Sequence, residues 1–285
     1  MNTGKYYFYF MMNRRAFFKG VSAAVVISAC GKIVSAVSPR HFDSKTIFRF
    51  AVGSDWHFGE PRTPSEQYFQ DLQNAFNQYQ QQYPCEFFVL NGDVIHNDPA
   101  LLMPAAAKLK QLHPQLFVTH GNHDMVTAAA WEQAWGYPLN HDVVVGNQVI
   151  LLGNTADEKG KYLCPDVAWF ARKLEQYKKA TNIFIFLHIT PVKWTDNGLD
   201  CAEFHTLIKK YPNIRAIFNG HDHDQDSVKM LDDCKIPFLF DGHIGGSWGV
   251  GYHGFRVVEL KEDGSLLSFI MNPLTRQNER VFPKV

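Results

Sequence analysis

Along the chain, segments with the apolar pattern of a strand alternate with segments whose apolar residues have the spacing of a helix. Residues 45–55 and 85–93 are predicted strands, and the second is a continuous apolar run, typical of a strand covered on both faces. Between them, Pro64 to Tyr83 carries apolar residues on one face of an amphipathic helix. A helix from Pro104 and a strand over 114–122 continue the alternation. Strand-helix-strand order predicts parallel strands joined by crossover helices, and therefore an α/β fold.

The second half of the chain continues the same pattern and then changes to antiparallel strands. It shows no internal repeat, low-complexity segment or linker, so residues 44–285 are interpreted as one domain. The predicted elements are a hairpin over 142–155 turning at Gly146-Asn147, a helix over 166–180, strands over 182–190 and 213–224, and antiparallel strands over 237–272.

The N-terminus, residues 1–30, is predicted to be an export signal. A basic stretch over 13–20 precedes a short apolar run over 21–29, too short for a membrane span. The pair Arg14 and Arg15, followed by two phenylalanines and a lysine, resembles a twin-arginine signal. The alternative is an N-terminal helix packed on the domain. The export interpretation predicts a periplasmic or cell-envelope protein and the twin-arginine export machinery as a partner.

Three details of this signal have alternatives. Translation starts at Met1 or at Met12, which would open a complete signal. The stretch ending at Cys30 resembles the lipobox of bacterial lipoproteins, which would attach a lipid anchor to that cysteine. Ordinary cleavage after Ala36 would instead remove Cys30.

Composition excludes several functions. The chain of 285 residues carries 28 basic and 28 acidic residues, so no basic surface attracts phosphate backbones and nucleic acid is not an expected partner. No G-x-x-x-x-G-K-[ST] motif is present, so the sequence does not predict a P-loop site for nucleoside triphosphates. The remaining cysteines, without any C-x-x-C pair, form two disulfides in any of three pairings or remain free thiols: Cys85, Cys164, Cys201 and Cys234.

Polar side chains follow five of the predicted strands, at the point where each strand ends. The carboxyl ends of parallel strands converge on one crevice, where α/β proteins bind ligands. Carboxylates and imidazoles without thiolates suit manganese, iron or zinc, and so many donors suit two ions about 3.5–4 Å apart, an arrangement used for phosphoryl hydrolysis. The residues are Asp55, His57, Asp93, Asn122, His123, His188, His221 and His223.

These motifs, in this order, resemble the calcineurin-like metallophosphoesterases. The matching segments are D-x-H at 55–57, G-D at 92–93, G-N-H-D at 121–124, the strand-end His188 and G-H-D-H at 220–223. The resemblance implies a four-layer α/β/β/α sandwich and two metal ions, with a hydroxide between them attacking phosphorus. It also implies ligand roles: Asp55, His57 and His223 at the first ion, Asp93 bridging, and Asn122, His188 and His221 at the second.

The resemblance assigns catalysis to His123, which would stabilise or protonate the leaving oxygen. Asp124 is expected to accept a hydrogen bond from His123 and keep it cationic. Single strand-end residues such as Asp55 more often cap helices. His96 and Asp98 are interpreted as residues of a surface loop. The alternative is that they contact Asp93 and hold it in position. The Gly-rich segment 241–254 is interpreted as a turn-rich connection with packed aromatics, and a border of the substrate pocket is the alternative.

The sequence therefore predicts an exported, metal-dependent phosphoesterase acting on small phosphate esters, with phosphodiesters or nucleotides favoured. A phosphomonoesterase of the same family is one alternative. The other is a metal-bound interaction module without catalysis.

Overall fold

The structure is a computed structural model that describes residues 26–27, 33–34, 44–272 and 274–284. Most of the predicted export signal, with Arg14, Arg15 and Cys30 and the alternative positions Met12 and Ala36, lies outside these residues. The described part of the signal, β1 (Val26–Ile27), pairs antiparallel with β2 (Ile33–Val34). Within the described part of the chain, no helix combines the length and the apolar content that a bilayer crossing requires.

The first of two six-stranded sheets has the order β14-β13-β12-β3-β4-β5. Its three strands β3, β4 and β5 are parallel, as the strand-helix alternation predicts. The other three are antiparallel. Their bounds are Thr46–Gly53 (β3), Phe88–Asn91 (β4), Leu116–Thr119 (β5), Phe255–Lys261 (β12), Leu266–Asn272 (β13) and Thr275–Phe282 (β14).

The second sheet has the order β10-β11-β9-β8-β7-β6. Strands β7, β8, β9 and β11 run parallel, while β6 and β10 are antiparallel edges. The predicted hairpin is β6–β7, turning after the Val145–Gln148 pair. The bounds are His141–Val145 (β6), Gln148–Gly153 (β7), Asn182–Leu187 (β8), Ile214–Asn219 (β9), Val228–Lys229 (β10) and Phe238–Phe240 (β11).

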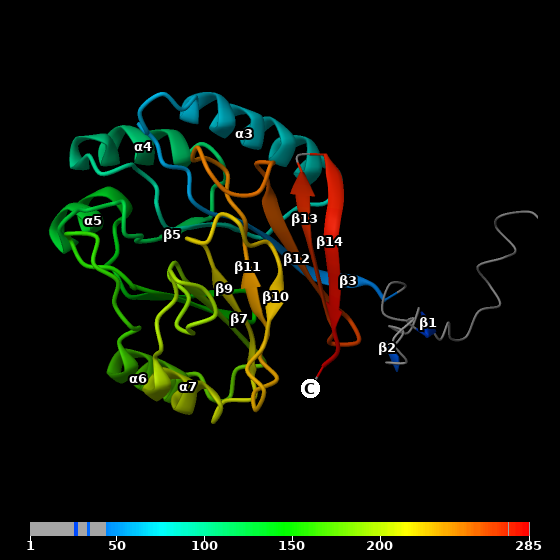
Figure 1. Ribbon diagram of the computed structural model, residues 1–285. Coiled ribbons are helices and arrows are strands. Elements are labelled where there is room, and N and C mark those ends of the chain that lie inside the picture. Colours follow the sequence, from blue (N-terminus) through cyan, green and yellow to red (C-terminus); the bar gives the residue numbers. More distant parts are fainter. Residues whose placement is uncertain (1–25, 28–32, 35–43, 273, 285) are drawn as a thin grey trace, which may run out of the picture.

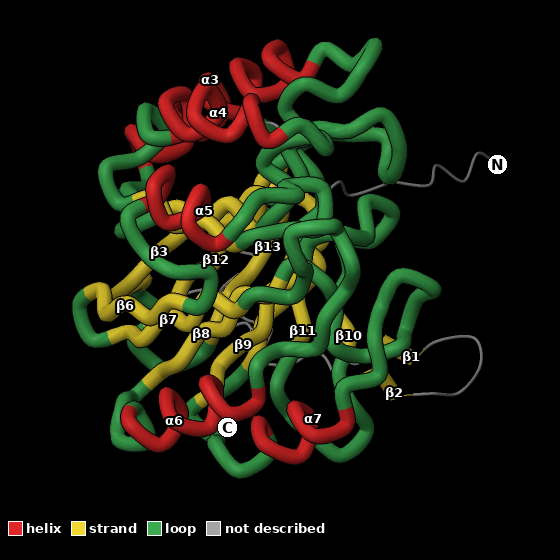
Figure 2. Tube along the Cα trace, turned by 90° about the vertical axis from the view of Figure 1, so that its left-hand side faces the viewer, coloured by secondary structure: helices red, strands yellow, loops and turns green. Residues whose placement is uncertain are grey.

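Helices cover the outer face of each sheet, so the predicted four layers are confirmed (Figures 1 and 2). On the first sheet lie α3 (Ser65–Gln82), α4 (Leu102–Leu109) and α5 (Ala128–Trp135), whose buried residues share one apolar cluster with that sheet. On the second lie α6 (Val167–Gln176) and α7 (Ala202–Ile208), with their own cluster. The short 3₁₀ helix η1 (Pro99–Leu101) leads directly into α4.

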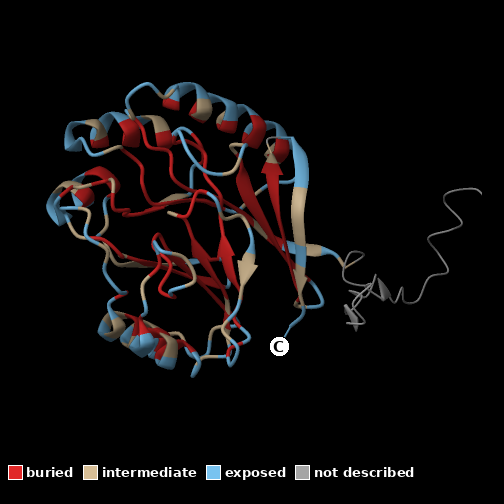
Figure 3. Ribbon diagram, viewed as in Figure 1, coloured by how far each residue is buried: buried red, intermediate tan, exposed pale blue. Residues whose placement is uncertain are grey.

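A third apolar cluster fills the space between the sheets. Phe50 of the first sheet stacks on Phe87 at 4.7 Å between ring centroids and meets Phe184 of the second sheet edge-on at 5.0 Å. Such aromatic pairs add about 0.5–1.5 kcal/mol each beyond their buried area. Figure 3 shows that the strands on both sides of this space are mostly buried. The two sheets are therefore held against one another by dense aromatic packing.

One buried cation also joins the two sheets. Arg256 of β12 is fully buried and its Nε lies 3.3 Å from Oδ1 of Asp241, which follows β11. Its guanidinium also donates to the Phe240 carbonyl, to Ser268 Oγ at 3.0 Å and to the Asp226 carbonyl at 3.1 Å. A buried charge held by a carboxylate and three oxygens fixes the position of β12 relative to β11.

Several predicted elements differ from the structure. The helix predicted from Pro104 begins at Leu102, so that Pro104 lies in its first turn, where its missing N–H has no intrahelical partner to lose. The helix predicted over 166–180 ends at Gln176. Within the segment predicted to be antiparallel, β11 is parallel to β9. The short α5 and α7 and the polar edge strand β14 were not predicted.

The four cysteines among the described residues form one disulfide, whereas the sequence predicted either two or none. Cys164 and Cys201 are bonded, with 5.7 Å between their Cα atoms. Cys85 and Cys234 are free. The bond joins the loop before α6 to the residue that precedes α7, and so it ties together the two helices on the second sheet.

Arg256→Met should lower the free energy of unfolding by about 3–5 kcal/mol, because it leaves the Asp241 carboxylate buried without its partner. Denaturant unfolding monitored by circular dichroism measures this change. The matched control is Lys108→Met, which breaks an exposed pair with Glu66 at 3.4 Å and should change stability by less than about 1 kcal/mol. An Arg256→Met protein as stable as the wild type would contradict the role of Arg256.

Candidate metal centre

The predicted site residues lie at the carboxyl ends of five parallel strands. Asp55 and His57 follow β3, Asp93 follows β4, and Asn122 and His123 follow β5. From the second sheet, His188 follows β8, while His221 and His223 follow β9. Both sheets therefore direct polar side chains to the same end of the molecule.

The backbone turns sharply at four of these residues. Asp55, His57, Asp93 and His221 have positive φ angles between 51° and 65°, a conformation that costs residues other than glycine free energy. Close packing maintains these turns. A side chain at Gly92 would place its Cβ 2.2 Å from Nδ1 of His188, so the loop after β4 can approach His188 only with glycine there.

The first group of ligand atoms comes from Asp55, His57 and His223, all buried. The Nε2 of His223 lies 3.2 Å from Oδ1 of Asp55 and 3.1 Å from Nε2 of His57. The Nε2 of His57 lies 3.8 Å from the same carboxylate oxygen. Three donors thus converge on one point.

The second group comes from Asp93, His188 and His221. The Nε2 of His188 lies 3.1 Å from Oδ2 of Asp93. This same oxygen lies 3.7 Å from Nε2 of His57, a member of the first group. Asp93 is therefore placed between the two groups, where a bridging carboxylate would lie.

Three buried polar atoms at the centre form no hydrogen bond with the described residues. They are Oδ1 of Asn122, Nε2 of His188 and Nε2 of His221. Buried polar atoms are normally paired, and an unpaired one needs an explanation. Metal coordination by an amide oxygen and by imidazole nitrogens supplies it, so the residues present fit the implied metal ions.

The centre combines ionised carboxylates with imidazoles whose pKa values move in both directions: burial opposes protonation of His188, but Asp93 and Asp55 outweigh it and raise its pKa to about 10. Burial lowers the pKa of His57 to about 3 and that of His221 to about 4, so both rings are neutral at physiological pH and have a lone pair to donate. Burial opposes ionisation of Asp55, but His223 and His188 outweigh it and hold its pKa below the usual range. Histidines likewise hold the pKa of Asp93 low against burial. Two carboxylates are therefore ionised in a buried site.

His123 lies beside these groups but contacts different partners from those expected. Its backbone N–H donates to Oδ1 of Asp93 at 2.8 Å, and its Nδ1 donates to Oδ1 of Asn97 at 2.8 Å. The hydrogen bond expected from His123 to Asp124 is therefore contradicted by the structure. Asp124 is buried and accepts from the backbone N–H groups of Gly121 at 2.7 Å and Ile95 at 3.1 Å, so its carboxylate organises two loops.

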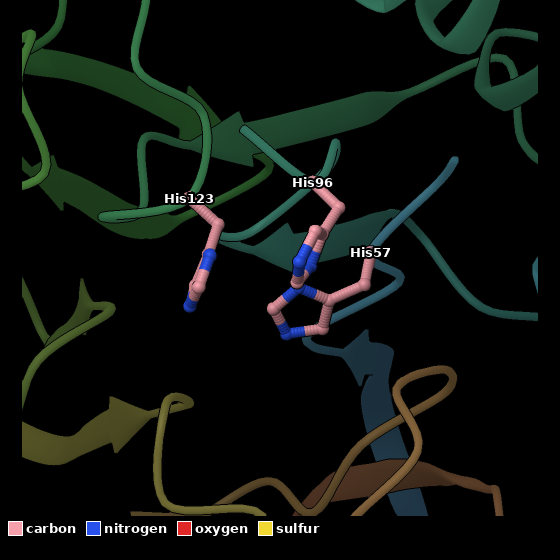
Figure 4. A group of neighbouring side chains, drawn as sticks. All are labelled: His57, His96 and His123. Atoms are coloured by element: carbon pink, nitrogen blue, oxygen red, sulfur yellow. The ribbon is translucent and has the colours of Figure 1, made fainter. Parts of the chain in front are cut away.

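His96 is a neighbour of the centre that the sequence interpretation placed in a surface loop. Figure 4 shows His57, His96 and His123 extending from three loops toward the same space. The Nδ1 atoms of His57 and His96 lie 3.1 Å apart, and the rings of His96 and His123 stack at 4.8 Å. Since Nδ1 of His57 is engaged by His96, its Nε2 is directed to the first group. Asp98 instead caps η1 through the Ala100 N–H.

Asn91, which the sequence interpretation also missed, supports the second group. Its carbonyl accepts from Nδ1 of His188 at 2.8 Å, which leaves Nε2 of that ring for the centre. Its side chain donates to Asp241 at 2.9 Å and accepts from Thr119 at 2.8 Å. A buried amide immediately before the G-D motif was the available signal for this role.

The chain resembles known proteins at three levels. Residues 48–225, which include every candidate ligand and His123, match the family described as calcineurin-like phosphoesterase. A probable cyclic nucleotide phosphodiesterase of Psychrobacter arcticus is 25% identical over a 164-residue match that covers 50% of this chain and 58% of the relative. The match thus spans less than two thirds of that protein.

Two solved structures share the fold at low sequence identity. A dimetal phosphatase from Danio rerio superposes with a TM-score of 0.67 and 12% identity over 85% of this chain and 100% of that protein. The purple acid phosphatase PPD1 of yellow lupin superposes with a TM-score of 0.62 and 10% identity, over 84% of this chain and 54% of that protein.

The family match covers more than half of the chain and includes the whole of the strand-end centre. The chain therefore belongs to the calcineurin-like phosphoesterase family, whose members are metal-dependent hydrolases of phosphate esters.

Proposed function

We propose that this chain is an exported phosphoesterase that hydrolyses small phosphate esters with two metal ions. The observation that carries the proposal is the position of Asp93 between two groups of buried ligand atoms. Asp55, His57 and His223 would hold the first ion, Asn122, His188 and His221 the second, and Asp93 would contact both. Two bound ions would supply the charge that activates water and neutralises phosphoryl oxygens.

The proton for the leaving oxygen would come from His123. Its Nδ1–H is held by Asn97 and its backbone N–H by Asp93, so the orientation of the ring is set from two sides. This leaves Nε2 as the ring atom that can face the leaving group. The amide oxygen of Asn97 accepts from Nδ1, so Asn97 makes the orienting contact that was expected of Asp124.

Phosphodiesters or nucleotides are the proposed substrate class. The description of the Psychrobacter relative as a probable cyclic nucleotide phosphodiesterase supports this class. Phosphomonoesters are the alternative within the same chemistry. Manganese, iron and zinc are the proposed ions, since carboxylate, amide and imidazole donors without thiolates suit all three.

Export is proposed from the N-terminal sequence. Arg14 and Arg15 ahead of an apolar run support recognition by the twin-arginine machinery, and Cys30 supports a lipid anchor. The disulfide between Cys164 and Cys201 supports an oxidising compartment such as the periplasm.

Hydrolysis should depend on added metal. The full-length protein, stripped of metal, is expected to release no p-nitrophenol from bis(p-nitrophenyl) phosphate or p-nitrophenyl phosphate, and reloading with manganese, iron or zinc should restore release. The faster ester identifies diester or monoester chemistry. Asp93→Asn is the matched variant and should lose both bound ions and turnover. A wild-type protein that binds two ions yet cleaves neither ester would instead be an interaction module.

His123→Ala should slow hydrolysis by about 10²- to 10⁴-fold, because it removes the proton donor. Metal content, measured by mass spectrometry, and the circular dichroism spectrum should stay those of the wild type. Asn97→Ala removes only the hydrogen-bond partner of Nδ1 and should cost less than His123→Ala. Undiminished turnover in His123→Ala would remove this residue from catalysis.

Replacing Arg14 and Arg15 together with lysine should keep the protein in the cytoplasm, because the export machinery reads the arginine pair rather than the charge. Fractionation of a Gram-negative host followed by immunoblotting measures the distribution. Cys30→Ser is the parallel variant and should abolish labelling by a radioactive fatty acid. Export of the double-lysine variant at the wild-type level would argue against the twin-arginine route.

A further inference from the structure

The Gly-rich segment 242–254 is pressed against the first ligand group. The N–H of Gly245 donates to the carbonyl of Asp55 at 2.9 Å, and the N–H of Val250 donates to that of His223 at 2.9 Å. Its outer side is fixed by Ser247 Oγ, which donates to Glu60 at 2.6 Å. The segment is therefore anchored on two loops that carry candidate ligands.

This close approach requires glycine. A side chain at Gly246 would place its Cβ 2.5 Å from the ring of His223 and 3.4 Å from that of His57. Gly246 also has a φ of 85°, which favours glycine on its own. The segment thus approaches the first group so closely that it leaves no room for a Cβ atom at residue 246.

Trp248 is the residue that this arrangement presents beside the centre. Its ring stacks on His223, with 4.3 Å between centroids and 10° between planes, and lies 4.9 Å from His57 and 6.3 Å from His123. Its carbonyl lies 3.2 Å from Nδ1 of His223, so its backbone supports a candidate ligand.

The exposure of Trp248 does not fit a packing role. The residue remains 44% exposed, although one face of the ring rests on His223. The other five tryptophans are buried or half-buried: Trp56, Trp131, Trp135, Trp169 and Trp194. A tryptophan used only to fill space would bury its large apolar area. An exposed indole that is held in place beside candidate metal ligands and the proposed proton donor His123 is instead typical of a binding surface for a planar molecule.

We propose that Trp248 is a stacking platform for a planar aromatic group of the phosphate ester, such as a nucleobase or an aryl group. This inference rests on the proposed function, since the phosphoryl group would bind at the metal ions while the aromatic part extends over the indole. Stacking on an aromatic side chain tolerates any base, because every base has a π face. The centre thereby favours nucleotides and aryl esters over alkyl esters.

The test compares two probes that share a sugar phosphate and differ in the base. Binding of adenosine 5′-monophosphate and ribose 5-phosphate to the metal-loaded full-length protein is measured by calorimetry. The wild type should bind the nucleotide about 5- to 150-fold more tightly, as expected for stacking of one base. Trp248→Ala should bring the two affinities together, and Trp248→Phe should keep most of the preference.

The control is Tyr162→Leu, which removes the aromatic ring beside His221 of the second group, at 4.8 Å between ring centroids. It should leave the ratio of the two affinities unchanged. Metal content is measured in every variant. If Trp248→Ala still bound the nucleotide more tightly than the sugar phosphate, or lost affinity for both probes equally, the proposed stacking role of Trp248 would be overturned. Failure of the metal-loaded wild type to bind either probe would overturn it as well. Failure of the proposed function is a separate result, namely absent hydrolysis in a protein that still prefers the nucleotide.

Discussion

The carboxylate of Asp93 is the contact on which the centre depends. One oxygen lies 3.1 Å from His188 of the second sheet and 3.7 Å from His57 of the first, and the other accepts the His123 N–H at 2.8 Å. A single side chain can reach these three partners only because β4 lies between β3 and β5 and ends at the same level. The second sheet must then present β8 to that point, so the packing between the sheets sets the geometry of the site.

This arrangement concentrates features that would destabilise a protein elsewhere. Two ionised carboxylates are buried, four site residues have left-handed backbone conformations, and three buried polar atoms of the centre form no hydrogen bond with the described residues. Together these cost several kcal/mol, since each strained residue alone costs about 1–3 kcal/mol. The cost is offset by rigid surroundings, the aromatic cluster around Phe50 and the buried Arg256 that joins β12 to β11.

The sequence predicted the parts of this structure that depend on chain direction and strand ends. Apolar runs located the parallel strands, and the convergence of their carboxyl ends brought Asp55, His188 and His223 together in prediction as in the structure. Contacts made by loops were harder to predict, because side-chain direction depends on the local turn. Asp124 points inward to two amides, so Asn97 takes the contact with His123. The polar strand β14 lacks the apolar alternation that marks a strand, and β11, only three residues long, gives no sign of its direction.

The proposed metal ligands and proton donor lie in one part of the chain, and the proposed contact with the organic group of the ester lies in another. All candidate ligands and His123 lie within residues 48–225, the segment shared with the family. Trp248 and Arg256 lie beyond it, in the connection to β12 and in β12 itself. The strand ends fix atoms that must keep constant distances, whereas a segment that contacts them mainly through backbone groups can change its exposed side chains without moving a ligand. The identity of residue 248 can therefore set which ester binds, while the reaction at phosphorus remains that of the family.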